Sequence, residues 1–249
     1  MTREDTSGTE LRLTVEVALT LDLVPEDLGP DDVAVVIDVV RASTTVAFAL
    51  QAGAEGVLPV ADEDGARAAA AARGALLAGE RGGHAPPGFD LGNSPRQMTA
   101  DAVAGRELVL TTTNGTLALA RCAGAGVLLT GALVNAEATA RAAAARARGR
   151  VLLVCAGSRR RLAADDVAAA GCLVGNLALL AAAEPSDGAR VAAALFDTWR
   201  HDLLGLLRRS RSGRHVIEQG LEDDLPLCAR VDTLPLAVGL DASGVLRKL

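Results

Sequence analysis

Residues 36–58, VIDVVRASTTVAFALQAGAEGVL, decide the fold because they hold one complete unit of a repeating pattern. An apolar, β-branched run leads into a polar loop, an Ala-rich helical segment follows, and Gly-Val-Leu begins the next apolar run. Residues 108–128, LVLTTTNGTLALARCAGAGVL, have the same order. Each stretch therefore predicts a strand, a polar loop, a helix and the beginning of a second strand.

The alternation of strand and helix patterns extends through most of the chain. Unbroken apolar runs are typical of strands that are buried on both faces of a sheet. Strands are predicted at residues 33–39, 57–60, 107–110, 127–130 and 151–155. Helices are predicted at residues 45–51, 62–77, 116–122, 136–147 and 166–183, followed by a charged helical region from 187 to 209. The fold class is therefore α/β, with a parallel or mixed sheet and helices on both faces.

The chain of 249 residues is predicted to form a single unit, residues 1–249. This length suits one large domain or two small domains that share a core, and no linker pattern divides the sequence. The likeness between residues 36–58 and 108–128 favours an internal duplication, with two intertwined similar halves at about 11–130 and 131–249. Convergence on a common strand–helix–strand pattern explains this likeness nearly as well.

Charge and composition exclude several function classes. The net charge is −6 and the chain has three Phe, one Trp and no Tyr, so it lacks the basic and stacking surfaces that bind nucleic acids. Its only lysine is Lys248, which excludes a phosphate-binding loop that ends in Gly-Lys and disfavours Schiff-base chemistry. Arginine supplies nearly all of the 25 basic residues, so any recognition of anions must depend on arginine.

The sequence predicts a cytoplasmic protein that does not associate with membranes. Residues 1–10 are polar and acidic and lack the apolar segment of a secretory signal. The longest uncharged run, residues 167–183, is marginal for a membrane span and is better explained as a buried helix. The chain has no Cys-x-x-Cys pair, which fits reduced thiols, and its three histidines are too dispersed for a zinc site.

Four polar loops follow predicted strands, where ligands bind in open α/β sheets. The first holds Asp38, Arg41, Ser43 and Thr44. Its carboxylate is suited to bind a metal or to act as a nucleophile, its guanidinium to clamp an anion, and its hydroxyls to bind phosphate. A capped helix beside a strand-end ion pair explains the same residues equally well.

The second polar loop is long and rich in glycine, which lets the backbone approach a ligand closely. Two apolar residues, Phe89 and Leu91, favour an ordered loop over a disordered one. The candidate donors and acceptors in this loop are Glu80, Arg81, Asp90, Asn93 and Ser94.

The third and fourth polar loops supply the remaining candidates. Thr113 and Asn114 lie in TTTNGT, which a turn before a helix explains for the most part. Arg159 belongs to an arginine run that precedes Asp165 and Asp166. Acids in a first helical turn are common, but two carboxylates beside arginines could also hold Mg²⁺ against a bound phosphate.

The fourth loop also offers a second catalytic hypothesis. Cys155 and Arg161 have the Cys-x5-Arg spacing of cysteine-dependent phosphatases, in which a thiolate attacks the phosphoryl group. The usual glycine of those enzymes lies three residues after the cysteine, whereas Gly157 lies two residues after Cys155. The match is therefore weak.

Taken together, the loop motifs resemble those of the 2-phosphosulfolactate phosphatase family. The similar motifs extend over about residues 33–235 and end with a tail that contains Ser212-Gly213-Arg214, Gly220, Asp224 and Cys228. They read VIDVVRASTT at 36–45, AGERGG at 78–83, GFDLGNSP at 88–95, TTTNGT at 111–116 and CAG at 155–157. One position departs from the family pattern, because Asp165 stands where the family typically has Glu.

The resemblance implies a Mg²⁺-dependent phosphatase with a three-layer α/β/α fold and an internal duplication. The implied reaction is the hydrolysis of 2-phosphosulfolactate to sulfolactate and phosphate, a step towards coenzyme M. Such a substrate brings about four negative charges, which requires arginines in the site. The implied partner is thus a small anionic phosphorylated acid. A non-catalytic binder of such an acid stays an alternative, and a homo-oligomer is left open.

The predicted site residues follow from the loops and the resemblance together. We expect Asp38 and Asp166 near the metal, with Glu80 or Asp90 as a base or as the group that positions water. The predicted catalytic residues are Asp38, Arg41, Glu80, Arg81 and Asp90. The predicted substrate-binding residues are Ser43, Thr44, Asn93, Ser94, Thr113, Asn114, Arg159 and Arg214, and the predicted metal ligands are Asp38, Asp165 and Asp166.

Overall fold

The computed structural model describes residues 13–249, which form an α/β fold around one mixed sheet. Within these residues the sheet has ten strands in the order β4-β5-β3-β10-β9-β6-β2-β7-β1-β8. The strands are β1 Leu13–Ala18, β2 Val33–Ile37, β3 Gly56–Pro59, β4 Leu76–Gly79, β5 Glu107–Thr111, β6 Val127–Gly131, β7 Arg150–Cys155, β8 Ala183–Pro185, β9 Val238–Leu240 and β10 Leu246–Lys248.

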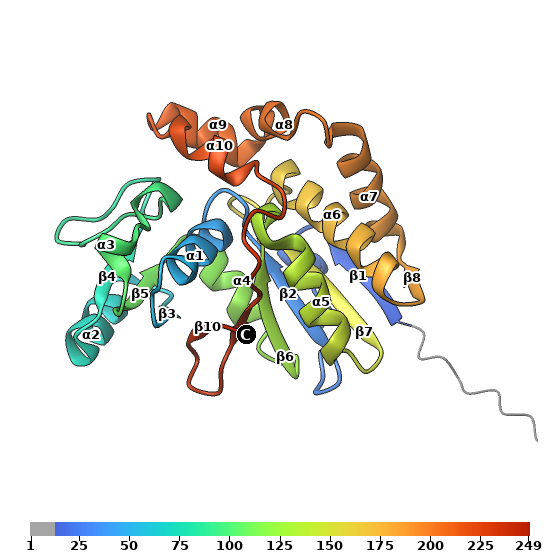
Figure 1. The fold of residues 1–249 in the computed structure, drawn as a ribbon, viewed down its shortest axis with the longest axis horizontal. Coiled ribbons are helices and arrows are strands. Elements are labelled where there is room, and N and C mark those ends of the chain that lie inside the picture. The colour runs from blue at the N-terminus through green and yellow to red at the C-terminus, as the bar shows by residue number, and fades with distance from the viewer. Residues whose placement is uncertain (1–12) are drawn as a thin grey trace, which may run out of the picture.

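Helices lie on both sides of this sheet (Figure 1). The α-helices are α1 Ala42–Gln51, α2 Glu63–Arg73, α3 Ala100–Val103, α4 Gly115–Arg121, α5 Ala136–Arg146, α6 Ala164–Leu180, α7 Asp187–Trp199, α8 Leu203–Arg209, α9 Arg211–Glu218 and α10 Leu225–Cys228. Short 3-10 turns are η1 Leu21–Leu23, η2 Pro95–Gln97, η3 Leu133–Asn135 and η4 Glu222–Asp224.

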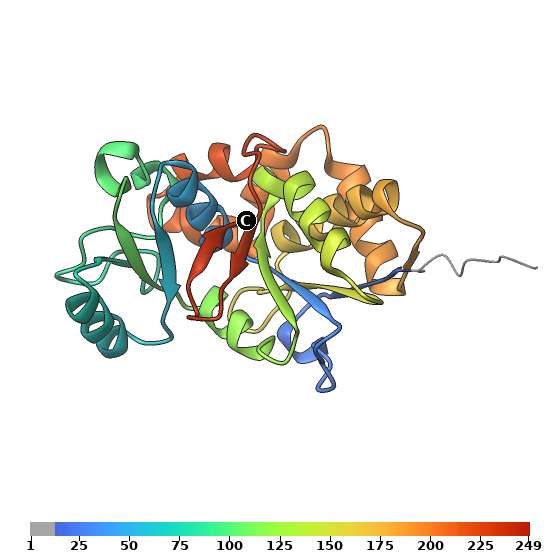
Figure 2. The ribbon, with the colours of Figure 1, turned by 60° about the horizontal axis from the view of Figure 1, so that its bottom comes forward.

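The sheet consists of two parallel groups that a hairpin joins. Strands β6, β2, β7, β1 and β8 form one parallel group, and β4, β5 and β3 form the other. The hairpin of β9 and β10 lies between them and is antiparallel to β6 on one side and to β3 on the other (Figure 2). The prediction of a parallel or mixed sheet is therefore confirmed in its mixed form.

The core has two layers because the side chains of the central strands alternate between the two faces of the sheet. In β2, Val33, Val35 and Ile37 pack against α5, α6 and α7, whereas Ala34 and Val36 pack on the side of α1 and α4. This arrangement confirms the three-layer α/β/α fold. Small residues bring the helices close together: a Cβ at Gly171 of α6 would lie 2.1 Å from the carbonyl oxygen of Ala192 in α7.

The prediction of one helix over residues 62–77 was wrong. Helix α2 ends before Gly74, whose φ of +61° is a left-handed conformation that terminates helices. The apolar residues that follow form strand β4, which pairs with β5. The predicted helix over 166–183 likewise occupies Ala164–Leu180 and gives way to β8. The sequence patterns also missed the six-residue strand β1 and the three-residue strands β9 and β10.

Three predictions concern a secretory signal, two similar halves and membrane-spanning helices. The absence of a secretory signal was predicted from residues 1–10, which lie outside the described residues. The proposed halves and the duplication stay predictions, and residues from both halves share the one sheet. None of the helices between residues 13 and 249 combines the length and apolarity that crossing a membrane would need.

Candidate active site

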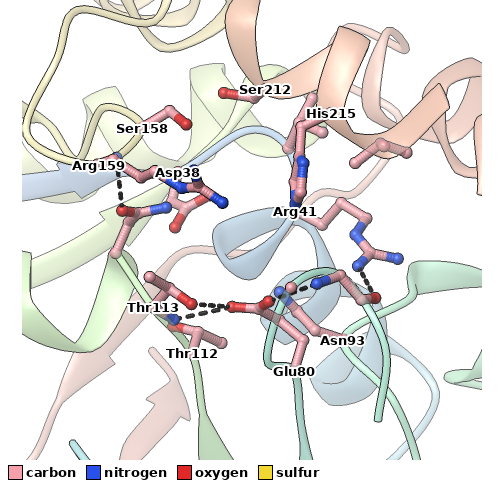
Figure 3. Close-up of a pocket in the computed structure, with 15 residues that line it drawn as sticks. Asp38, Arg41, Glu80, Asn93, Thr112, Thr113, Ser158, Arg159, Ser212 and His215 are labelled. Carbon is pink, nitrogen blue, oxygen red and sulfur yellow. Dashed lines mark hydrogen bonds between the residues drawn. The ribbon is translucent and has the colours of Figure 1, made fainter. Parts of the chain in front are cut away.

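A pocket of about 150 Å³ lies where loops from both parallel groups meet helix α9 (Figure 3). The loops follow β2 and β7 in one group and β4 and β5 in the other. Sequence reasoning placed candidate residues in all four of these loops. The lining residues are Asp38, Val40, Arg41, Glu80, Gly82, Gly83, Asn93, Thr112, Thr113, Asn114, Ser158, Arg159, Ser212, His215 and Val216.

Asp38 lies at the end of β2 with its carboxyl group in the pocket wall. Its backbone amide donates to Ser43 Oγ at 3.0 Å, and its Oδ1 accepts from the amide of Ala42 at 3.3 Å, so the first turn of α1 fixes the side chain. Burial raises the pKa of Asp38 to about 7, and the negative charges of Asp165 and Glu80 act in the same direction. The carboxyl group is therefore poised between its two protonation states near neutral pH.

Two further carboxyl groups, Asp165 and Asp166, are buried in the first turn of α6 behind the pocket. Asp166 accepts from the amides of Val39 and Gly157, each at 2.8 Å, and so joins the loops after β2 and β7. Burial raises the pKa of Asp166 above its ordinary value, and the charges of Asp165 and Asp38 add to this effect. Asp166 therefore holds the loops after β2 and β7 together.

Asp165 differs from Asp166 in its hydrogen bonding. Neither of its oxygens accepts a hydrogen bond of normal geometry from residues 13–249. Burial raises its pKa to about 6, although the hydroxyl groups of Ser210 and Ser212 lie near enough to lower the pKa in part. Ser212 lines the pocket, whereas Asp165 does not.

Arg41 is buried and links three parts of the chain. One terminal nitrogen of its guanidinium donates to Asp224 Oδ2 at 2.7 Å, and the other donates to the carbonyl oxygen of Gly83 at 2.7 Å. Asp224 also accepts from Ser94 Oγ at 2.6 Å. The ion pair thus holds the C-terminal segment around η4 against the loops after β2 and β4.

Glu80 is a second carboxylate that the pocket holds in place. It accepts from the amide and hydroxyl of Thr113 at 2.8 and 2.7 Å, and from the amide of Gly83 at 2.9 Å (Figure 3). Burial acts to raise the pKa of Glu80, but these hydrogen bonds and the charge of Arg41 lower it below its ordinary value. Glu80 is therefore ionised at neutral pH, and it joins the loops after β4 and β5.

Two predicted catalytic residues do not line the pocket. Arg81 donates to Thr111 Oγ1 at 2.9 Å and lies 3.6 Å from the carboxylate of Glu63. Asp90 accepts from the amide of Leu77 at 2.8 Å. Arg81 therefore contacts β5 and α2, whereas Asp90 contacts β4, and both residues lie outside those that surround the cavity.

The predicted substrate-binding residues divide in the same way. Asn93, Thr113, Asn114 and Arg159 line the pocket, and the oxygen of the buried Asn93 amide has no hydrogen-bond partner among residues 13–249. Three of the others form hydrogen bonds within the fold: Ser43 with Thr130 at 2.8 Å, Thr44 with the carbonyl oxygen of Val39 at 2.8 Å, and Ser94 with Asp224. Arg214 lines an adjoining cavity.

The sequence predicted Arg214 of helix α9 as a site residue but missed His215 and Ser212 of the same helix. The imidazole of His215 points from this helix into the pocket (Figure 3). Ser212 lines the pocket one helical turn earlier. The tail motif Ser212-Gly213-Arg214 marked this segment, but the motif alone does not show which face of a helix meets the strand ends.

The predicted metal ligands can be tested against the donors that the pocket offers. No group of three or more carboxylate, imidazole or thiol side chains within the described chain is arranged to hold a metal ion by itself. Mg²⁺ in proteins often uses one or two carboxylates, with waters and phosphate oxygens completing its octahedron. Asp38 and the unsatisfied Asp165 fit that smaller set, whereas both oxygens of Asp166 already accept backbone amides.

The fold and the pocket define an α/β protein with a small cavity lined by polar loops, and comparison with known proteins narrows this class to the phosphoric monoester hydrolases. The chain belongs to the family described as 2-phosphosulpholactate phosphatase, whose model matches residues 18–242. The family resemblance of the loop motifs is therefore confirmed.

Three similar proteins are each named probable 2-phosphosulfolactate phosphatase. The protein from Gloeobacter violaceus is 43% identical over 237 residues, which cover 94% of this chain and 98% of that protein. The protein from Thermus thermophilus is 43% identical over 224 residues, covering 86% of this chain and 90% of its own. The protein from Deinococcus radiodurans is 44% identical over 220 residues, with the same coverage of the two chains.

The geometry around Cys155 argues against thiolate catalysis. The side chain is fully buried at the end of β7 and does not line the pocket. Burial raises the pKa of Cys155 well above its ordinary value, and the charges of Asp166 and Asp165 raise it further. The thiolate that a cysteine-dependent phosphatase needs is therefore strongly disfavoured.

Replacing Cys155 with serine is consequently expected to leave the rate of phosphate release from a phosphomonoester within about twofold of the unaltered protein, since the thiol does not reach the pocket. Because a buried hydroxyl can destabilise the fold, Cys155→Ala serves as a second variant. Initial rates measured at equal concentrations of folded protein check the prediction. A loss of several orders of magnitude in both variants would instead support the thiol as nucleophile.

Proposed function

We propose that this chain hydrolyses 2-phosphosulfolactate to sulfolactate and phosphate, with Mg²⁺ as its cofactor, as a step towards coenzyme M. The names of its relatives and of its family support the substrate. The observation that carries the proposal is the convergence of Asp38 and Arg41, from the loop after β2, and Glu80, from the loop after β4, on one small cavity. Such a cavity suits a reaction that depends on positioning and on charge stabilisation.

The charge balance of the pocket supports a divalent cation. The charge of Asp165 raises the pKa of Asp38, the charges of Asp165 and Asp38 raise the pKa of Asp166, and Glu80 adds a fixed negative charge. The positive charge of Arg41 is already paired with Asp224. Among residues 13–249, Arg159 is the arginine of this wall that is left without a carboxylate partner to meet a phosphate. We propose that Asp38 and Asp165 hold Mg²⁺, which would supply the charge that neutralises phosphoryl oxygens and orients a water.

The other pocket residues are suited to bind and orient the substrate. The exposed guanidinium of Arg159 can donate to an anionic oxygen, and the unpartnered oxygen of Asn93 is free to accept from a ligand. His215 points into the cavity, and an imidazole can give a proton to a leaving alkoxide at neutral pH. Glu80 keeps the loop of Thr113 in place through its hydrogen bonds.

Phosphate release from a panel of 2-phospho acids tests this proposal directly. We expect release from 2-phosphosulfolactate in Mg²⁺, its loss in EDTA, and its recovery when excess Mg²⁺ is returned. Release that EDTA does not affect would refute the metal assignment. Tight binding of the panel without release under any divalent cation would favour the non-catalytic binder.

The carboxyl groups of the pocket predict a pH dependence of stability. Burial raises the pKa of Asp38 to about 7 and that of Asp165 to about 6, from an ordinary value of 3.8. When the pH is below this ordinary pKa, both carboxyl groups are protonated in the folded and in the unfolded state. As the pH rises towards 7, the unfolded chain loses the protons of Asp38 and Asp165 before the folded chain does. Without a metal ion, the free energy of unfolding therefore falls over this pH range.

Mg²⁺ is therefore expected to raise the Tm more at pH 8 than at pH 5, because it binds carboxylates that have lost their protons. At a concentration 100 times its Kd, the gain is about 2.7 kcal/mol, or roughly 5–10 °C for a chain of this size. Differential scanning calorimetry at matched ionic strength measures the shift, with Asp165→Asn as the control that should reduce it. Equal shifts at both pH values, or an undiminished shift in Asp165→Asn, would contradict the assignment.

A further inference from the structure

A second cavity of about 240 Å³ adjoins the pocket on the side of helix α9. Ser158, Arg159 and His215 line both cavities, so the two spaces share one wall. The remaining lining residues, Arg211, Arg214 and Glu218, all belong to α9. Sequence reasoning had singled out Arg159 and Arg214 without a geometry to connect them, and this cavity brings them together.

The second cavity is more positive than the first. It has three arginines against the single carboxylate of Glu218, whereas the first pocket has Asp38 and Glu80 in its wall against Arg159 and Arg41, and Arg41 is already paired with Asp224. Among residues 13–249, neither Arg159 nor Arg211 forms an ion pair with a carboxylate, and neither does Arg214, which donates to the carbonyl oxygen of Arg209. Guanidinium groups without a carboxylate partner can bind an anion without first breaking an ion pair.

Arg159 is held at the boundary between the two cavities. Its φ is +52°, a left-handed conformation that costs free energy for a residue with a side chain. Its backbone amide donates to Asn114 Oδ1 at 3.1 Å, so the loop after β5 secures the loop after β7 (Figure 3). The guanidinium of Arg159 is thereby attached to a fixed backbone instead of a free surface loop.

We propose that the cavity of Arg159, Arg211 and Arg214 is a second anion subsite, which binds the sulfonate of the substrate while its phosphoryl group occupies the first pocket. This inference rests on the proposed function and deepens it. The different charges of the two cavities determine the orientation of the substrate. The pocket with Asp38 and Glu80 favours the phosphoryl group together with its metal ion. The cavity with three arginines favours the sulfonate, which has no metal ion. Arg211 and Arg214 are then specificity-determining residues.

The test compares two substrates that differ only in the sulfonate, 2-phosphosulfolactate and 2-phospholactate. For Arg211→Gln and Arg214→Gln, we expect kcat/KM for 2-phosphosulfolactate to fall about tenfold or more, mainly through KM, as for a lost hydrogen bond to a charged group. For 2-phospholactate, kcat/KM should stay within about twofold, because this substrate lacks the group that the arginines bind. Arg141→Gln removes the same charge from the exposed face of α5 and should affect neither substrate.

Each outcome has a distinct meaning. Equal losses for the two substrates, or no loss for 2-phosphosulfolactate, would overturn the subsite. If the unaltered protein releases phosphate from neither substrate, the proposed function fails, and calorimetric titration with sulfolactate then tests the subsite on its own. Binding that Arg211→Gln weakens about tenfold relative to Arg141→Gln supports the subsite, and equal or absent binding in all three proteins overturns it.

Discussion

Replacing Asp38 with asparagine is expected to lower kcat for phosphate release by about 10²- to 10⁴-fold, the effect of losing a charged group that acts on the reacting atoms. Asparagine is nearly the same size, and its Oδ1 can still accept from the amide of Ala42, so the fold should be retained. The variant lacks the ionisable oxygen that we propose to hold the metal. Initial rates at saturating substrate and Mg²⁺, together with the Tm, measure the two effects separately.

Asp90→Asn is the matched control for this prediction. It makes the same chemical change in the neighbouring loop, at a carboxylate that accepts from the amide of Leu77 and does not line the pocket. We expect kcat to stay within about threefold of the unaltered protein, as for a residue away from the reacting atoms. Loss of activity in Asp90→Asn with full activity in Asp38→Asn would reverse the roles that the geometry gives to these residues.

The second large effect is expected at Asp224. Its replacement by alanine leaves the guanidinium of Arg41 buried without its partner, which typically costs about 3–5 kcal/mol of unfolding free energy. Activity should be lost as well, since the same ion pair positions Arg41 in the pocket wall. Chemical denaturation followed by circular dichroism measures the loss of stability.

The neighbouring residue provides the control. Asp223 forms an exposed ion pair with Arg96 at 2.8 Å, and Asp223→Ala should cost less than about 1 kcal/mol because exposed pairs contribute little. The double variant Arg41→Met, Asp224→Leu should recover part of the stability of Asp224→Ala but none of the activity, since apolar residues can replace a buried ion pair. Equal losses in Asp223→Ala and Asp224→Ala would contradict the buried role of the Arg41–Asp224 pair.

The sequence predicted the loops of the site better than the direction of their side chains. Residues 36–45 identified a strand end followed by a helix, and such a junction places Asp38 and Arg41 near a ligand in any open α/β sheet. Arg81 and Asp90 also lie in a glycine-rich loop, but their orientation depends on strands β4 and β5. Because residues 62–77 were interpreted as one helix, the pairing of β4 with β5 was not foreseen, and these are the two strands that bind the side chains of Asp90 and Arg81.

Contacts between distant segments were beyond the reach of sequence patterns. The partner of Arg41 is Asp224, and no local periodicity connects positions so far apart. His215 belongs to a short helix whose orientation is set by packing against the rest of the fold. The hairpin of β9 and β10 was missed because three-residue strands carry almost no periodic signal.

That hairpin has a consequence for the order in which the protein folds during synthesis. The strands of the β4, β5, β3 group have all been translated by residue 111, and those of the other parallel group by residue 185. The two strands that join the groups, Val238–Leu240 and Leu246–Lys248, are synthesised after all of these. Each group therefore has an unpaired edge strand, β3 or β6, until the hairpin has been synthesised. During this interval the unpaired edge strands are the sites at which we expect chaperones to bind the nascent chain.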